Sequence, residues 1–266
     1  MVSRFWLVAL SFATAQVLPG APPQSAPPQA GFLNEAKADQ PPAVQPPKPL
    51  RVLSPEMRGD IFMARKMYRE AAEAYQEAPK NPVLLNKTGI AYHQMLELSV
   101  AEKYYRQAIK ANPNYSEAVN NLGTVYYARK SFRRAVNEYK KALRLSPESA
   151  SVWSNLGTGY FARKDYKLAA QAFQKALALN PDVFETRSTQ GVLLQEQSVE
   201  ERAKYHFYLA ETYAKAGAND RALLYIRKAL EEGYKERKKI GDDPAFAALK
   251  ELPEFKELMA LEPRVL

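Results

Sequence analysis

Few residues in this sequence could carry out covalent chemistry. Its two histidines, His93 and His206, lie far apart, and it contains no cysteine, which excludes disulfides and thiol catalysis. The sequence also contains no metal-ligand cluster, no glycine-rich phosphate loop and no nucleophile elbow. We therefore predict that the protein is not an enzyme and that it uses no cofactor and no metal ion.

Polar residues that could hold a partner recur at helical spacing instead. Asn120, Asn121 and Thr124 share one face of a predicted helix over residues 116–128, and Asn155 repeats Asn121 in the next unit. An asparagine amide donates and accepts hydrogen bonds together, which matches the backbone of an extended peptide. The predicted partner-binding residues are Lys87, Asn120, Asn121, Thr124, Tyr127, Asn155, Thr158 and Phe161.

These positions recur because the sequence itself repeats. Glycine stands at four positions 34 residues apart, and proline, alanine and aromatic residues recur in step with it. A fixed period of this length indicates one supersecondary unit stacked on copies of itself, which presents a long concave surface. The default function of such a surface is to hold a partner. The four glycines are Gly89, Gly123, Gly157 and Gly191.

Each unit is predicted to be two antiparallel helices. In residues 116–149, Val119 and Tyr126 lie on the buried face of the first helix, and Tyr139 lies on the buried face of the second. Pro147 then ends the second helix, because proline lacks the backbone N–H. The recurring glycine lets the two backbones approach closely, and the recurring aromatic side chains fill the space beside it.

This pattern resembles the tetratricopeptide repeat, over roughly residues 54–234. The resemblance implies an all-α fold, a right-handed α–α superhelix of antiparallel helix pairs, with a peptide or protein bound in its concave groove. It is strongest over residues 150–183, where the consensus positions hold Trp153, Leu156, Gly157, Tyr160, Ala169, Phe173, Ala176 and Pro181.

Two questions about the binding row stay open at the level of sequence. Asn121 and Asn155 could read the backbone of a peptide, or asparagine could simply be common before Leu-Gly in this repeat family. Tyr127 and Phe161 could stack on a ligand, or they could pack against a neighbouring second helix.

The repeats are predicted to form a solenoid over residues 51–236, with about five units. One unit near residues 184–216 is irregular, because a helix at about 200–216 fits two registers. It would serve both as the partner of a helix at 184–196 and as the first helix of the last pair. Residues 237–266 are predicted to form capping helices.

The front of the chain resembles a signal peptide over residues 1–15. Arg4 gives a positive start, residues 5–12 are apolar, and Ala-Thr-Ala at 13–15 forms a small-residue cleavage site. Residues 16–50 are rich in proline and are predicted to be a disordered linker. We therefore expect an exported protein, periplasmic or secreted, of the bacterial cell envelope; cleavage of the signal stays open.

The net charge of +9 favours acidic partners. We predict a scaffold for protein–protein interactions that binds in the concave groove. The alternative is a binder of an anionic polymer, an acidic polysaccharide or, with less support, RNA, through basic loops inside each pair. Nucleic acid is disfavoured because the groove has no regular row of lysine or arginine. The basic loops contain Arg65-Lys66, Arg129-Lys130 and Arg163-Lys164.

Overall fold

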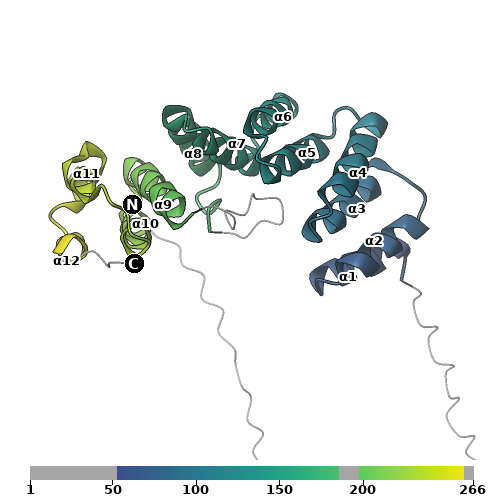
Figure 1. Cartoon of the computed structure of the whole chain (residues 1–266), viewed down its shortest axis with the longest axis horizontal. Coiled ribbons are helices and arrows are strands. Elements are labelled where there is room, and N and C mark those ends of the chain that lie inside the picture. The colour runs from purple at the N-terminus through teal and green to yellow at the C-terminus, as the bar shows by residue number, and fades with distance from the viewer. Residues whose placement is uncertain (1–52, 186–197, 261–266) are drawn as a thin grey trace, which may run out of the picture. The chain divides into compact units, whose positions relative to one another are not determined.

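A computed structural model describes residues 53–185 and 198–260 of the chain. All regular elements in these two ranges are helices (Figure 1), so the prediction of an all-α fold is confirmed. The helices are α1 (Pro55–Ala64), α2 (Tyr68–Glu77), α3 (Pro82–Gln94), α4 (Leu98–Ala111), α5 (Ser116–Ala128), α6 (Phe132–Leu145), α7 (Ala150–Ala162), α8 (Tyr166–Leu179), α9 (Val199–Lys215), α10 (Asn219–Glu231), α11 (Arg237–Asp242), the 3-10 helix η1 (Pro244–Leu249) and α12 (Pro253–Ala260).

Consecutive helices pack as pairs, and each pair packs on the next. The pairs are α1 with α2, α3 with α4, α5 with α6, α7 with α8 and α9 with α10. The second helix of each pair contacts the first helix of the following pair, from α2 on α3 to α8 on α9. This is the predicted solenoid of helix pairs. No helix in the described ranges is both long enough and apolar enough to cross a membrane.

Three sequence predictions lie outside the described residues. They are the signal peptide at 1–15, the linker at 16–50 and the helix at 184–196. Within the described residues, α9 pairs with α10 and also contacts α8.

Inside each of the first four pairs, from α1 with α2 to α7 with α8, a glycine contacts an aromatic ring. A Cβ atom on Gly123 would lie 2.6 Å from Cε1 of Tyr139, whose side chain is fully buried. A gap that small admits no methyl group, so glycine is required for the two helices to approach this closely. The same contact joins Gly59 to Tyr75, Gly89 to Tyr105 and Gly157 to Phe173.

The basic loops lie in the turn inside each pair, which has the same backbone conformation throughout. The residue after the helix C-cap takes a left-handed backbone conformation, as Lys130 does with φ of 57°. Its amide donates to the carbonyl of Tyr127 at 2.8 Å, which satisfies a group that the helix end leaves free. The residues in this conformation are Lys66, Leu96, Lys130, Lys164 and Gly217.

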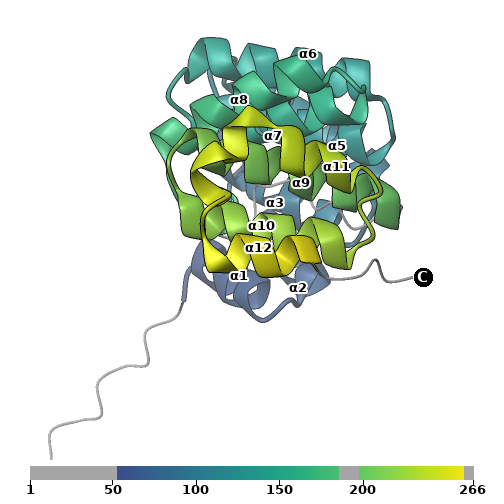
Figure 2. The same ribbon diagram turned by 90° about the vertical axis from the view of Figure 1, so that its left-hand side faces the viewer.

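The C-terminal helices close the last pair with apolar side chains. Figure 2 shows α12 beside α10, in agreement with their contacts. Phe207 of α9 stacks on Tyr234, with ring centroids 4.8 Å apart, and meets Phe246 of η1 at 6.0 Å. The apolar side chains of η1 and α12 that close the pair, Phe246, Leu249, Phe255 and Leu258, are all buried.

We expect Gly123→Ala to lower the free energy of unfolding by about 1–3 kcal/mol, because the new methyl group overlaps the fully buried ring of Tyr139. Urea denaturation of the purified chain measures the change.

Gly241→Ala is the matched control, because the nearest atom to its added Cβ is Cε of Met259 at 4.0 Å. Alanine also favours a helix over glycine by about 1 kcal/mol, so this variant should be as stable as the wild type or more stable. Equal losses in both variants would contradict the close-contact explanation.

Candidate functional site

The predicted binding row lies on the first helices of three successive pairs, α3, α5 and α7. These helices also contact one another, α3 with α5 and α5 with α7. Lys87 keeps part of its side chain exposed, whereas the others are buried. The buried members are Asn120, Asn121, Thr124, Tyr127, Asn155, Thr158 and Phe161.

The asparagine side chains bond to one another across the three helices. Asn121 donates through Nδ2 to Oδ1 of Asn86 at 3.0 Å, and Asn155 donates to Oδ1 of Asn120 at 2.9 Å. Asn120 donates to Oδ1 of Asn121 at 3.4 Å, which joins the two bonds. Asn86 in turn donates to the hydroxyl of Tyr115 at 3.3 Å. We call Asn86, Asn120, Asn121 and Asn155 the amide row.

Asn86 is not among the predicted partner-binding residues, although it precedes Asn120 by one period of 34 residues. Lys87, not Asn86, stands at the position of Asn121. The hydrogen bond from Asn121 to Asn86 joins two positions that are not equivalent in the repeat. Whether such positions meet depends on how neighbouring units stack, and the sequence of one unit does not show this.

The two aromatic residues of the row are packed among other rings. Tyr127 meets Phe132 of α6 with ring centroids 5.3 Å apart. Phe161 meets Tyr166 of α8 at 5.5 Å and Tyr205 of α9 at 5.4 Å. Edge-to-face and tilted contacts at these distances stabilise a core. Of the two alternatives that the sequence left open, stacking on a ligand and packing against neighbouring helices, both rings adopt the packed arrangement in this structure.

The threonine hydroxyls bond to their own helices. Thr124 donates to the carbonyl of Asn121 at 2.7 Å, and Thr158 donates to the carbonyl of Ser154 at 3.0 Å. The Oγ1 atom of Thr124 also lies 3.5 Å from Nδ1 of His93. Burial lowers the pKa of His93 below its ordinary value, so its neutral form is favoured at pH 7.

Lys87 ties α3 to α1. Its ammonium lies 2.8 Å from a carboxylate oxygen of Glu56 and 2.8 Å from one of Asp60. Asp60 also accepts a hydrogen bond from the hydroxyl of Tyr75 at 2.7 Å. The pKa of Lys87 is raised above its ordinary value by these two carboxylates, although burial acts in the opposite direction.

The second histidine lies beside one carboxylate. Nδ1 of His206 is 2.8 Å from Oε2 of Glu232. Burial lowers the pKa of His206, and Glu232 opposes that shift. Within residues 53–185 and 198–260, no group of three or more histidine, cysteine, aspartate or glutamate side chains could hold a metal ion.

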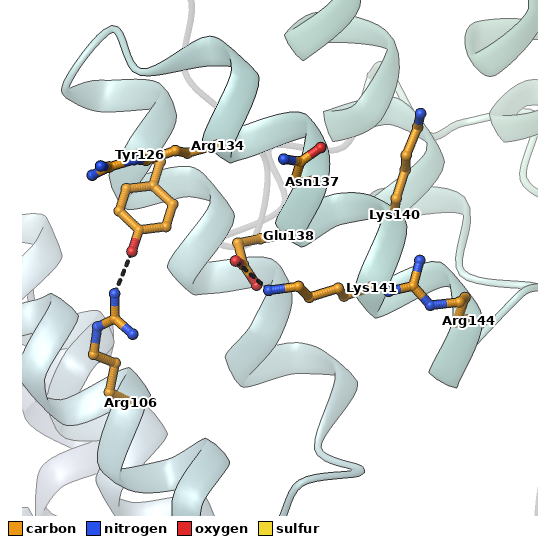
Figure 3. Close-up of a pocket in the computed structure, with 8 residues that line it drawn as sticks. All are labelled: Arg106, Tyr126, Arg134, Asn137, Glu138, Lys140, Lys141 and Arg144. Atoms are coloured by element: carbon orange, nitrogen blue, oxygen red, sulfur yellow. Dashed lines mark hydrogen bonds and ion pairs between the residues drawn. The ribbon is translucent and has the colours of Figure 1, made fainter.

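A groove between α4 and α6 is a surface feature that the sequence analysis did not identify as a site. It holds a cavity of about 490 Å³, whose lining residues Figure 3 shows, and a second cavity of about 440 Å³ shares part of that lining. The basic character of α6 was visible in the sequence, but the contribution of α4 was not. We call this surface the α4–α6 groove; its polar lining is Arg106, Lys110, Tyr126, Arg134, Asn137, Glu138, Lys140, Lys141 and Arg144.

Comparison with protein families gives three matches, all to tetratricopeptide repeats. Two models described as "Tetratricopeptide repeat" match residues 150–183 and 87–132, and one described as "TPR repeat" matches residues 125–158. None of the curated proteins compared with the chain matches it.

Several solved structures are similar to this one. A crystal structure of MamA is 21% identical, covers 69% of this chain and 96% of its own, and has a TM-score of 0.45. MamA from Desulfovibrio magneticus RS-1 is 20% identical over 70% of this chain and 93% of its own, with a TM-score of 0.45. YrrB, described as a TPR protein with an unusual peptide-binding site, is 21% identical over 47% of this chain and 67% of its own, with a TM-score of 0.43.

We expect Asn121→Ala to lower the free energy of unfolding by about 1–3 kcal/mol, because it leaves the buried amides of Asn86 and Asn120 each short of a bond. Denaturation in urea checks this.

Asn137→Ala makes the same chemical change at an exposed helical position in α6, and it should alter stability by less than about 0.5 kcal/mol. A similar, small effect of both substitutions would show that the amide row does not hold the helices together.

Proposed function

The chain is a tetratricopeptide-repeat protein, and we propose that it serves as a non-enzymatic scaffold for a peptide or protein partner. The observation that carries the proposal is the amide row. Three successive first helices contribute asparagines, and their side chains form one hydrogen-bonded line. Such a line has both donors and acceptors along its length, as an extended backbone does.

A partner would reach this row by exchange of hydrogen bonds. In the free protein the asparagine side chains hydrogen-bond to one another. A peptide backbone must therefore replace these side-chain hydrogen bonds with hydrogen bonds between the asparagine amides and its own peptide groups. Each neutral bond contributes only about 1 kcal/mol net, so the exchange itself is nearly balanced. Within the predicted set, Lys87 has a partly exposed side chain, and Tyr127 and Phe161 pack among other rings in this structure. The proposed contact is therefore made by the amides of the set and by Lys87; the full predicted set is Lys87, Asn120, Asn121, Thr124, Tyr127, Asn155, Thr158 and Phe161.

The chemistry of the described residues supports a role without catalysis. His93 and His206 are each accounted for by neighbouring side chains, Thr124 and Glu232 respectively. The other polar contacts that join helices in the row are the ion pairs of Lys87 and the hydrogen bonds between asparagine side chains. These contacts position helices, which is the role that a scaffold requires.

Export to the cell envelope is part of the proposal, and it rests on the sequence of residues 1–15. We expect the mature protein to begin at Gln16, after the Ala-Thr-Ala site. Intact-mass analysis of protein purified from its native cell tests this. A mass that includes Met1 to Ala15 would contradict export by cleavage.

The alternative, an anionic polymer bound by the basic loops, has one observation in its favour. Lys66, Lys130 and Lys164 lie in equivalent exposed turns. Two loop arginines are already paired, however: Arg129 with Glu102, and Arg163 with Asp165 at 3.1 Å. The charge that the loops can offer is therefore smaller than the sequence indicates.

Affinity capture with the mature chain as bait tests the scaffold. We expect a protein partner from the envelope fraction, identified by mass spectrometry, that is lost with the Asn121→Ala/Asn155→Ala variant. The variant is used below its unfolding temperature, checked by circular dichroism.

Lys130→Gly/Lys164→Gly is the matched control for the loops. Glycine is preferred in the left-handed conformation, so this variant removes two charges without loss of stability. The scaffold proposal predicts full capture by this variant. Loss of binding here, together with retention by the asparagine variant, would contradict it and favour the polymer alternative.

A further inference from the structure

We propose that the α4–α6 groove is a second docking surface, which binds an acidic amphipathic segment of a protein partner. Such a segment has aspartate or glutamate side chains together with apolar ones. The proposal does not depend on the amide row, since the groove and the row share no residue.

The groove is built from three helices. Val119, Leu122 and Tyr126 of α5 lie at i, i+3 and i+7, so they share one face, and that face forms the floor between α4 and α6. The two adjoining cavities, of about 490 and 440 Å³, both include Arg106 and Lys141 in their linings, so they form one continuous groove.

The rim of the groove is strongly cationic. Arginine and lysine side chains from both walls line it, and Glu138 is the single carboxylate in the linings of the two cavities. Glu138 is paired with Lys141 at 2.7 Å, and Arg106 is paired with Glu102 at 3.0 Å. In the described part of the chain, no carboxylate pairs with the other four rim cations, Lys110, Arg134, Lys140 and Arg144, all of which are exposed.

The arrangement of these cations favours carboxylates. Arg144 and Arg134 carry planar guanidinium groups, which bind a carboxylate through two parallel hydrogen bonds. Figure 3 shows Arg134, Lys140, Lys141 and Arg144 spaced along α6, with Arg106 facing them from α4. The guanidinium of Arg106 donates to the hydroxyl of Tyr126, which fixes it at the groove.

One end of the groove is apolar. Ile109 and Pro113 belong to its α4 side, and Leu145 lies at the end of α6 with 38% of its surface exposed. Burial of these groups stabilises a complex only if the partner offers apolar side chains of its own. A segment that combines acidic and apolar side chains therefore matches both parts of the groove.

The same features disfavour a uniformly charged polymer. A continuous row of phosphates or sulfates has no apolar groups to cover Ile109, Pro113 and Leu145 at the apolar end. The ring of Tyr126 is only 5% exposed and lies beneath the guanidinium of Arg134, 5.8 Å from the ring centroid. The lining of the groove thus offers no open ring on which a nucleic-acid base could stack.

The test is fluorescence anisotropy with the full chain and a labelled synthetic peptide of repeated Glu-Glu-Leu. We expect binding that weakens as salt is added. The Lys110→Gln/Arg144→Gln variant should bind about tenfold more weakly, since it removes two unpaired rim charges. The matched control, Lys66→Gln/Lys164→Gln, removes the same charge from the loops and should bind as the wild type does.

A second variant tests the apolar end. Leu145→Ser should weaken binding of the Glu-Glu-Leu peptide severalfold and leave binding of a Glu-Glu-Ser peptide unchanged.

Three results would overturn the proposal: no binding of the Glu-Glu-Leu peptide, equal losses in the groove and loop variants, or tighter binding of heparin or single-stranded DNA than of the peptide. This test uses variants outside the amide row, and the capture test uses variants outside the groove lining, so the two proposals can fail independently.

Discussion

The structure depends on the contact between a glycine in the first helix and an aromatic ring in the second, which the first four pairs share. Gly123 and Tyr139 show its geometry: no atom can be added to the glycine without displacing a fully buried ring. The contact limits how far apart the two helices of a pair can lie. Because α1 to α8 repeat it, equivalent positions on their successive first helices come into register.

That register determines which polar groups meet. On α3, α5 and α7 it brings asparagines from different units to within hydrogen-bonding distance, and they are buried together. Buried amides are costly unless bonded, so a row in which each side chain bonds to its neighbours stabilises one stacking of the units over others. On the outer sides of α4 and α6, four cations, Lys110, Arg134, Lys140 and Arg144, have no carboxylate partner among the described residues and stay exposed.

Much of the fold could be predicted from the sequence because each unit is specified locally. The helix expected over residues 116–128 is α5, and the glycine–aromatic contact follows from spacing within one unit. Packing of Phe161 against a neighbouring second helix was one of two sequence alternatives, and Tyr166 of α8 provides it. Its contacts with Tyr205 and Tyr208 could not be predicted, since these residues belong to α9, beyond the regular period. The α4–α6 groove was missed for a related reason, because its walls come from two different units.

The binding role of the row follows from the chemistry of its amides, and one measurement tests it most directly. Hydrogen exchange of the chain, alone and with its captured partner, reports which helices the partner covers. The account predicts slower exchange in α3, α5 and α7 on binding, because the partner backbone lies along the amide row. Unchanged exchange in all three helices, in a complex that is saturated with partner, would contradict it.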